Sequence, residues 1–219
     1  MIHKFALGLL VVLIGSGMSM GISANIQHQI DNPPLPSDQI QYSGDFKWDT
    51  TTQPTSGPRL SMDAIASMAQ NFSAQYKTGI EIVQIIETTK YFYISFRETA
   101  SGVGAFELLA NPVTGQMGIE NGPSQFWNTK YGVWGSGKSI TNGISSAQAQ
   151  NIAFQYLKSN DPLVNLDPEP IAFYGYYSFT ERLGDKITGV LSVNGYSGEV
   201  EPHTWLGNIL QTKDFTKKQ

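Results

Sequence analysis

Histidine and carboxylate side chains are the first candidates for chemistry in this chain. Its three histidines stand at positions 3, 28 and 203. A zinc site needs several protein ligands, and His203 has only Glu201 as a close acidic neighbour. Glu199 and Glu201 share one side of an expected strand, and paired carboxylates can act as acid and base when their pKa values are pushed apart. No further group completes either site. We therefore expect no catalytic residue and no metal centre, and a solvated strand end at His203.

The segment Gly132–Ser139 has the bare spacing of a phosphate-binding loop, Gly-x-x-x-x-Gly-Lys-Ser. Such a loop joins an apolar strand to a helix. Residues 128–131, which precede it, do not form an apolar strand, and residues 140–143 do not begin a helix. We interpret residues 128–143 as a connection between two units, and we expect no nucleotide or other cofactor.

Four aromatic residues gather at this connection, and they support two interpretations. They are Phe126, Trp127, Tyr131 and Trp134. Aromatic side chains bury large areas, so they can seal a joint between two units, with both indoles shielded; this is the interpretation that we favour. Alternatively, they line an exposed groove for a partner. In that case Trp127, Tyr131 and Trp134 are the partner-binding residues.

The composition excludes some classes of protein. The chain has 219 residues, no cysteine and a net charge of −4. Without cysteine it can form no disulfide and carry out no thiol chemistry. Its acidic balance provides no electrostatic attraction to nucleic acid, so we expect no nucleic-acid partner.

The N-terminus is typical of a targeting segment. A short basic start is followed by an uncharged stretch, residues 5–24, whose apolar half passes into small residues. This pattern predicts a cleaved secretory signal over residues 1–24, although the stretch is also long enough to be retained as a membrane anchor. In either case the protein lies outside the cytoplasm. Residues 25–58 are rich in proline and threonine and predict a linker, and residues 207–219 predict a polar tail.

The rest of the chain contains an internal duplication. Residues 91–98 (YFYISFRE) match residues 174–181 (YGYYSFTE) at an offset of 83 positions. The same offset aligns residues 111–117 with residues 194–200. Because repeats determine architecture, the chain is expected to form two similar units.

Each unit begins with a helical pattern and continues with short strands. Ser61 is a good N-cap for the first helix, and Ser145 or Ser146 for the second. Apolar residues then follow helical spacing before the strands begin. The predicted fold class is α+β, with two repeated units, residues 59–127 and 144–206, each a helix packed on a small antiparallel sheet.

This order of elements resembles the PepSY domain. The family's last hairpin carries an Asp/Asn-x-x-Thr-Gly-Glu-Val-like turn, and residues 111–117 (NPVTGQM) and 194–200 (NGYSGEV) are similar to it. The resemblance covers residues 60–120 and 145–205. PepSY domains occur in propeptides of secreted metallopeptidases and in exported or membrane-attached proteins, and the family carries no catalytic residues. The resemblance therefore implies a role in restraining peptidases or at the cell envelope. No peptidase follows in this chain, so inhibition would act in trans.

We expect a non-enzymatic exported protein that binds another exported protein, such as a peptidase. One alternative is a structural protein that stabilises the cell envelope and is tethered by its N-terminal helix through residues 5–24. The other is a hydrolase whose site is not recognisable from the sequence.

Overall fold

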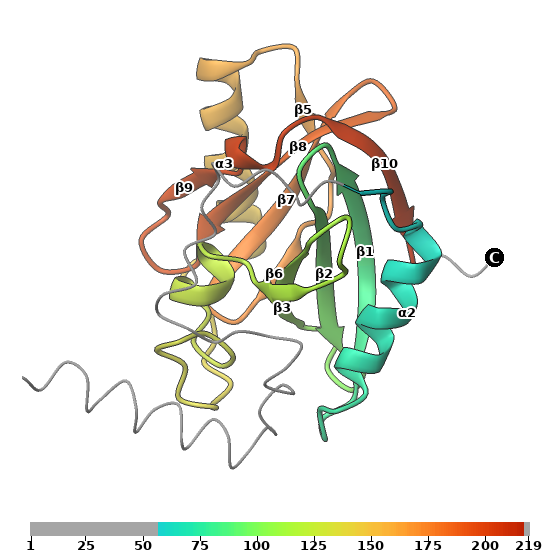
Figure 1. Cartoon of the computed structure of the whole chain (residues 1–219). Coiled ribbons are helices and arrows are strands. Elements are labelled where there is room, and N and C mark those ends of the chain that lie inside the picture. The colour runs from blue at the N-terminus through green and yellow to red at the C-terminus, as the bar shows by residue number, and fades with distance from the viewer. Residues whose placement is uncertain (1–56, 217–219) are drawn as a thin grey trace, which may run out of the picture.

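The structure of this protein, a computed structural model, describes residues 57–216 (Figure 1). The predicted targeting segment, residues 1–24, and nearly all of the predicted linker lie outside the described residues. The helical elements are α2 (Met62–Ser73), η1 (Pro123–Trp127), α3 (Ser146–Asn160) and η2 (Thr204–Leu206). The strands are β1 (Ile80–Thr88), β2 (Phe92–Glu98), β3 (Gly104–Ala110), β4 (Met117–Ile119), β5 (Asn165–Leu166), β6 (Ile171–Phe173), β7 (Tyr176–Leu183), β8 (Lys186–Asn194), β9 (Val200–Pro202) and β10 (Ile209–Asp214).

Both helices begin at the capping serines that the sequence predicts. The Ser61 hydroxyl accepts a hydrogen bond from the backbone N–H of Ala64 at 3.2 Å. The Ser145 hydroxyl accepts one from the N–H of Gln148 at 3.3 Å, and the Gln148 side chain accepts one from the N–H of Ser145 at 2.8 Å. This reciprocal pair is a capping box, which satisfies two N–H groups that a helix start leaves unpaired.

The two duplicated turns also adopt the same conformation. Asn111 accepts a hydrogen bond from the backbone two residues ahead, and Asn194 does the same in the second copy. Gly115 and Gly198 then take φ values of +72° and +75°, a region that favours glycine. The conformation of these turns is therefore repeated at the 83-residue offset.

The predicted fold class, however, is wrong. The strands do not form two separate small antiparallel sheets; they form one mixed ten-stranded sheet in the order β10-β1-β2-β3-β6-β7-β8-β9, with β4 beside β3 and β5 beside β7. The halves join where β3 and β6 run parallel, with Gly104 opposite Phe173. A Cβ on Gly104 would lie 2.5 Å from the Phe173 ring. Hydrophobic periodicity predicts strands, but it does not show which edges pair, and an unpaired edge is a site for a further strand.

The segment expected as a polar tail contributes to the same sheet. Within residues 207–219, β10 pairs antiparallel with β1, and Lys213 lies opposite Ile85. Most positions of β10 are exposed to solvent, which is consistent with its polar composition. Polar composition alone therefore did not reveal that this segment covers the edge of β1.

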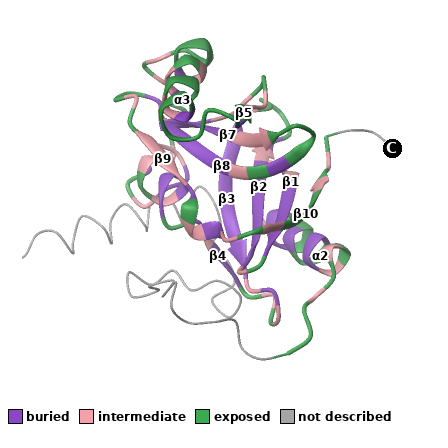
Figure 2. Cartoon of the chain, turned by 90° about the horizontal axis from the view of Figure 1, so that it is seen from above, coloured by how far each residue is buried: buried purple, intermediate pink, exposed green. Residues whose placement is uncertain are grey.

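The two helices cover different halves of the sheet. Figure 2 shows α2 and α3 at opposite ends of the molecule, with strands between them. Ile65 and Phe72 of α2 belong to the core formed with β1, β2 and β3. Ala149 and Leu157 of α3 belong to the core formed with β7 and β8. Each half of the sheet therefore has one face covered by a helix.

The other faces of the two halves pack on each other. A third apolar cluster contains Ile86 of β1, Tyr93 of β2, Leu109 of β3 and Val190 of β8. Since side chains alternate along a strand, these residues lie on the face that the helices do not cover. Burying this face also buries the polar side chains that share it, and they form part of the candidate site.

Candidate functional site

The aromatic residues predicted to bind a partner separate into buried and exposed side chains. Tyr131 is 2% exposed and belongs to the core under α2. Trp134 is 63% exposed and Phe126 is 49% exposed, while Trp127 is half-buried. The interpretation that both indoles are shielded is therefore wrong for Trp134. Tyr131 lies in the joint between the two halves instead.

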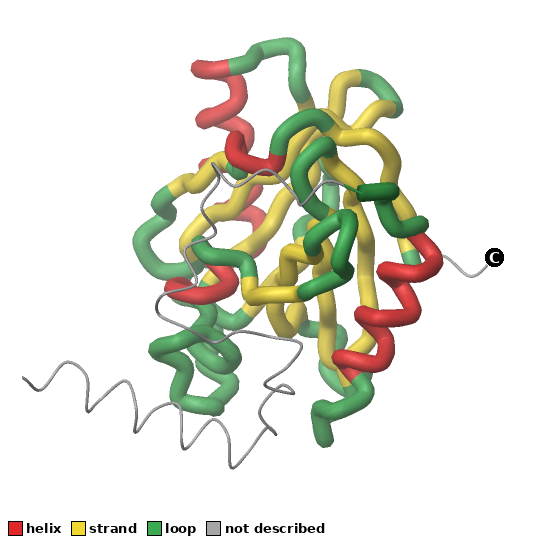
Figure 3. The backbone as a smooth tube through the Cα atoms, viewed as in Figure 1, coloured by secondary structure: helices red, strands yellow, loops and turns green. Residues whose placement is uncertain are grey.

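Asn128 holds the connection against the sheet. This side chain is 1% exposed. Its amide donates a hydrogen bond to the carbonyl of Ala105 at 2.7 Å, and its Oδ1 accepts hydrogen bonds from the N–H groups of Lys130 and Tyr131 at 3.1 and 2.8 Å. The Asn128 side chain thus links β3 to the connection. The connection itself contains no regular helix or strand between η1 and α3 (Figure 3).

A further backbone contact brings the exposed aromatic residues onto neighbouring segments. The N–H of Val133 donates to the carbonyl of Gln125 at 2.8 Å. Phe126 and Trp134 each follow one of these paired residues. The segment Gly132–Ser139, which has the spacing of a phosphate-binding loop, lies within this connection, and α3 does not begin until seven residues after it.

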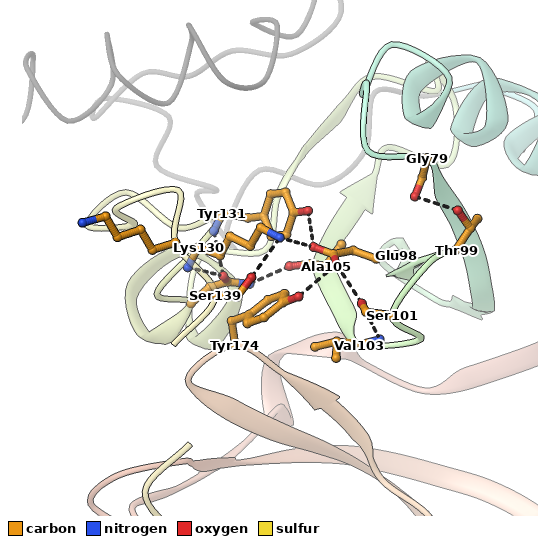
Figure 4. A network of polar contacts seen from close by, with 12 residues as sticks. Gly79, Glu98, Thr99, Ser101, Val103, Ala105, Lys130, Tyr131, Ser139 and Tyr174 are labelled. Atoms are coloured by element: carbon orange, nitrogen blue, oxygen red, sulfur yellow. Dashed lines mark hydrogen bonds and ion pairs between the residues drawn. The ribbon is translucent and has the colours of Figure 1, made fainter. Parts of the chain in front are cut away.

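Glu98, at the end of β2, receives hydrogen bonds from several parts of the chain (Figure 4). Lys130 Nζ and the Tyr131 hydroxyl each lie 2.5 Å from its Oε1. The hydroxyls of Tyr174 and Ser101 donate to its Oε2 at 2.9 and 2.7 Å. Lys130 and Tyr131 belong to the connection, and Tyr174 belongs to the second half of the chain. This carboxylate therefore links both halves to the connection.

The electrostatics of Glu98 are those of a structural group. Burial raises its pKa, but the hydrogen bonds from Lys130 and the three hydroxyls outweigh burial, so its pKa lies below the usual 4.5. The side chains of Lys130 and Glu98 are only 13% and 8% exposed. A catalytic acid or base needs a pKa near the working pH, whereas Glu98 stays ionised and engaged with its donors.

Two further carboxyl groups lie between the two halves of the sheet. Glu107 of β3 and Glu120, directly after β4, are opposite each other, because the N–H of Glu120 donates to the carbonyl of Glu107 at 2.9 Å and Leu108 pairs with Ile119. Opposite residues of an antiparallel pair point to the same face. Both glutamates are 0% exposed. We call them the buried acid pair.

The buried acid pair has neutral hydrogen-bond donors. The Tyr176 hydroxyl donates to Glu107 Oε2 at 3.0 Å, and the Ser95 hydroxyl donates to Glu107 Oε1 at 3.3 Å. The backbone N–H of Ser124 donates to Glu120 Oε2 at 2.9 Å. Glu120 Oε1 has no hydrogen-bond partner among the described residues. Within residues 57–216, neither carboxyl group forms an ion pair with a lysine or arginine.

Burial raises the pKa of both members of the pair. It raises the pKa of Glu107 to about 7, against the opposing effect of the hydroxyl donors. It raises the pKa of Glu120 well above the usual value, and the charge of Glu107 raises it further. Two carboxyl groups this close cannot both ionise without mutual repulsion, so they titrate as a unit. Because both are fully buried, a substrate cannot reach them.

His203 lies inside the protein and not at a solvated strand end, so that expectation is wrong. The residue is 4% exposed, its Nε2 is 3.2 Å from the Ser192 hydroxyl, and its ring stacks on Trp205 at 5.2 Å between centroids. Burial lowers its pKa to about 3, so the imidazole is neutral. Ser192 is 0% exposed, which closes this contact to a substrate. The described part of the chain contains no cluster of three or more potential metal ligands.

The two glutamates of β9 and its turn have different surroundings. Glu199 is exposed, whereas Glu201 is half-buried. Burial, and then the charge of Glu199, raises the pKa of Glu201. A Cβ on Gly122 would lie 2.6 Å from Glu201 Oε1 and 2.5 Å from Glu120 Oε1. Glu201 therefore extends toward the buried acid pair, with Gly122 leaving the space between them.

The comparisons with known proteins show no family for this chain. No family model and no curated protein match it. Among solved structures, it is similar to the Bacillus megaterium YpeB C-terminal domain, with 13% sequence identity and a TM-score of 0.25 over 67% of this chain and 63% of that chain. The similarity thus spans slightly less than two thirds of that domain's chain. At this level it establishes neither a shared fold nor a shared function.

Neither described helix combines the length and the apolar character needed to cross a membrane. The stretch that suggested an anchor, residues 5–24, lies outside the described residues.

The buried carboxyl groups were not predicted from the sequence, although one signal was present. Glu107 interrupts the apolar run Ala105–Leu109, and an acid at the centre of such a strand is expected either to face solvent or to have a special environment. Glu120 offers no comparable signal, since it precedes a turn. Glu98 likewise ends a strand, where an exposed acid is common.

Proposed function

We propose that the protein is an exported, non-enzymatic module that binds another protein through its connection. The observation that carries this proposal is the exposure of Phe126 and Trp134, which we call the aromatic surface. Trp134 is 63% exposed, although it is among the largest apolar side chains. Exposed aromatic side chains are favoured as anchors in protein interfaces, and leaving them in water is costly unless a partner covers them.

The rigidity of the underlying segment supports this proposal. Asn128 and the Val133–Gln125 contact hold the backbone on both sides of the aromatic surface. Tyr131 fastens the same loop to Glu98 at 2.5 Å. Side chains presented by an ordered loop lose less conformational entropy when they bind. These buried contacts hold the connection in one conformation, as a preformed binding surface requires.

The charges near the aromatic surface suggest the chemistry of the partner. The chain has a net charge of −4, but residues 121–160 contain no aspartate or glutamate. Lys138 of the connection is exposed. Complementary charge improves specificity and association rate, so the partner should present an apolar pocket with a neutral or acidic rim.

An exported peptidase is the class of partner that the PepSY resemblance favours. The basic start and the uncharged stretch of residues 5–24 favour a location outside the cytoplasm. A binding role is also consistent with the enclosed carboxyl groups, since Glu107 and Glu120 are 0% exposed and could not contact a substrate in this structure.

The test uses the full chain and a surface variant. Wild type and Trp134→Ala are used as bait in an extract of exported proteins, and a protein retained by wild type alone is purified. Its affinity for both baits is then measured by calorimetry, together with peptidase activity where it has any. Leu163→Ala is the matched control, because Leu163 is 73% exposed and lies outside the connection.

We expect Trp134→Ala to weaken the purified complex by about 30-fold, the effect of an interface anchor, with unchanged melting temperature. Leu163→Ala should bind like wild type. Equal affinity of the wild-type and Trp134→Ala proteins would refute the assignment of the aromatic surface.

A further inference from the structure

The buried acid pair is connected directly to the aromatic surface through one residue. The backbone N–H of Ser124 donates to Glu120 Oε2 at 2.9 Å. The Ser124 hydroxyl accepts a hydrogen bond from the N–H of Glu107 at 2.8 Å. Ser124 is the second residue of η1 and is 0% exposed. The same η1 turn carries Phe126, so both acids hold the element that presents this ring.

The remaining contacts of η1 are formed within its own neighbourhood. The N–H groups of Gln125 and Phe126 donate to the carbonyl of Gly122, and that of Asn128 donates to Pro123. These bonds close the turn, but they do not attach it to the sheet. Hydrogen bonds of Ser124 and of the Asn128 amide attach it to the sheet, and the N–H of Thr129 donates to the carbonyl of Tyr174 just after it. A change at the acid pair therefore acts on one of several attachment points, the one at Ser124.

The groups that surround the acid pair cannot neutralise two negative charges. Its titratable neighbours come from β2, β7, β9 and the turn after β9: Tyr93, Tyr176, Glu201 and His203. Burial raises the pKa of both tyrosines, and the charge of Glu107 raises each further. Both therefore remain neutral, and the Tyr176 hydroxyl donates to Glu107. Glu201 adds negative charge beside Glu120, and His203 is uncharged because it is buried.

We propose that the protonation state of the Glu107–Glu120 pair regulates the aromatic surface by fixing or releasing η1. This inference rests on the proposed function. While the pair holds a proton, its repulsion is small, and Ser124 is held by the Glu120 carboxyl group and by the backbone N–H of Glu107. When that proton is lost, two buried carboxylates repel each other, and the charge of Glu201 adds to the repulsion on Glu120. The repulsion displaces Glu120 from its position, and the Ser124 N–H loses its acceptor.

Hydrogen exchange of the purified full chain tests the switch without any partner. Protection of the amide protons of Ser124, Phe126 and Asn128 is measured between pH 6 and pH 8.5 and corrected for the chemical exchange rate. We expect their protection to fall by about tenfold or more across this range, because local opening becomes easier. Amide protons in α2 should lose less protection than those of η1, because only the global loss of stability reaches them.

Variants identify the group responsible. Glu107→Gln and Glu120→Gln keep the shape of the side chain but leave only one acid, so two carboxylates cannot repel each other and protection of η1 should vary by less than about twofold with pH in either variant. Glu81→Gln is the control, because Glu81 pairs with Arg97 at the surface; it should behave like wild type. If neither variant folds, the carboxyl resonances of Glu107 and Glu120 in the ¹³C-labelled wild-type protein decide. Two carboxyl groups that are both already ionised at pH 6 overturn the proposal.

The outcomes separate this inference from the proposed function. Protection that is independent of pH in wild type, or that still changes in both glutamine variants, overturns the switch. Binding that depends on Trp134 can persist in that case. Conversely, a pH-dependent η1 without any partner sensitive to Trp134→Ala leaves the switch standing and refutes the aromatic surface as a binding site.

Discussion

Replacing Glu98 by glutamine should destabilise the protein more than breaking a surface ion pair would. The change keeps the size of the side chain but removes its charge. Lys130 Nζ, on a side chain that is 13% exposed, would then lose its anionic partner and keep the Ser139 hydroxyl at 3.3 Å and the faces of Tyr174 and Tyr131 at 4.7 and 5.3 Å. Removing one partner of a buried ion pair costs about 3–5 kcal/mol, because the other charge remains unpaired. Since the new amide oxygen can still accept a hydrogen bond from Tyr131, we expect about 3 kcal/mol.

Urea unfolding at pH 7, followed by circular dichroism, measures this loss in the free energy of unfolding. Glu81→Gln is the control: the Arg97–Glu81 pair has side chains 35% and 45% exposed, and exposed pairs contribute only about 0–1 kcal/mol. The sign with pH follows from the pKa of Glu98, which is lowered in the folded state. Its ionised form stabilises the fold above the usual pKa, and this contribution is lost as the pH falls below 4.5 toward the folded-state pKa.

The gap between wild type and Glu98→Gln should therefore shrink in acid. Two results would contradict the reasoning: a loss no larger than that of Glu81→Gln at pH 7, or a gap that widens as the pH falls. Either would mean that Glu98 is not the carboxylate that joins the two halves.

Three further perturbations have defined outcomes. Because the pKa of Glu107 is raised from 4.5 to about 7, stability should fall by about 3 kcal/mol as the pH rises through this window; urea curves of Glu107→Gln should lack that part of the slope. Gly104→Ala places a methyl group 2.5 Å from the Phe173 ring and should lower the free energy of unfolding by about 1–3 kcal/mol through overpacking. An unchanged melting temperature would argue against the β3–β6 junction. Trp134→Ala should leave the melting temperature unchanged, since its side chain is 63% exposed; a clear drop would show that the indole is packed.

Local structure was the most predictable part of this protein. The first helix starts after the predicted cap Ser61, and the second after Ser145, one of the two serines that the sequence offered as its cap. Capping and tight turns depend on residues within a few positions, so the sequence contains the whole interaction. The glycines at 115 and 198 illustrate the same point, since their positive φ values are required by the turn itself.

The site was predictable only in part. The aromatic cluster at the connection was recognised, yet which rings are buried depends on contacts with distant residues. Tyr131 is enclosed because Glu98 and Tyr174 lie next to it, whereas Trp134, three residues later, has no such cover. A sequence window cannot distinguish these two cases, because both residues are large and aromatic.

The amino-acid sequence by itself determined the helix caps and the repeated turns, because these depend on local backbone chemistry. Only the tertiary structure decided that the strands join into one mixed sheet, with Gly104 beside Phe173 at the junction. It also decided that Glu107 and Glu120 lie opposite each other, fully buried. Both outcomes depend on which sheet edges and faces meet, and such long-range pairing is selected by the burial of whole surfaces and not by any single residue.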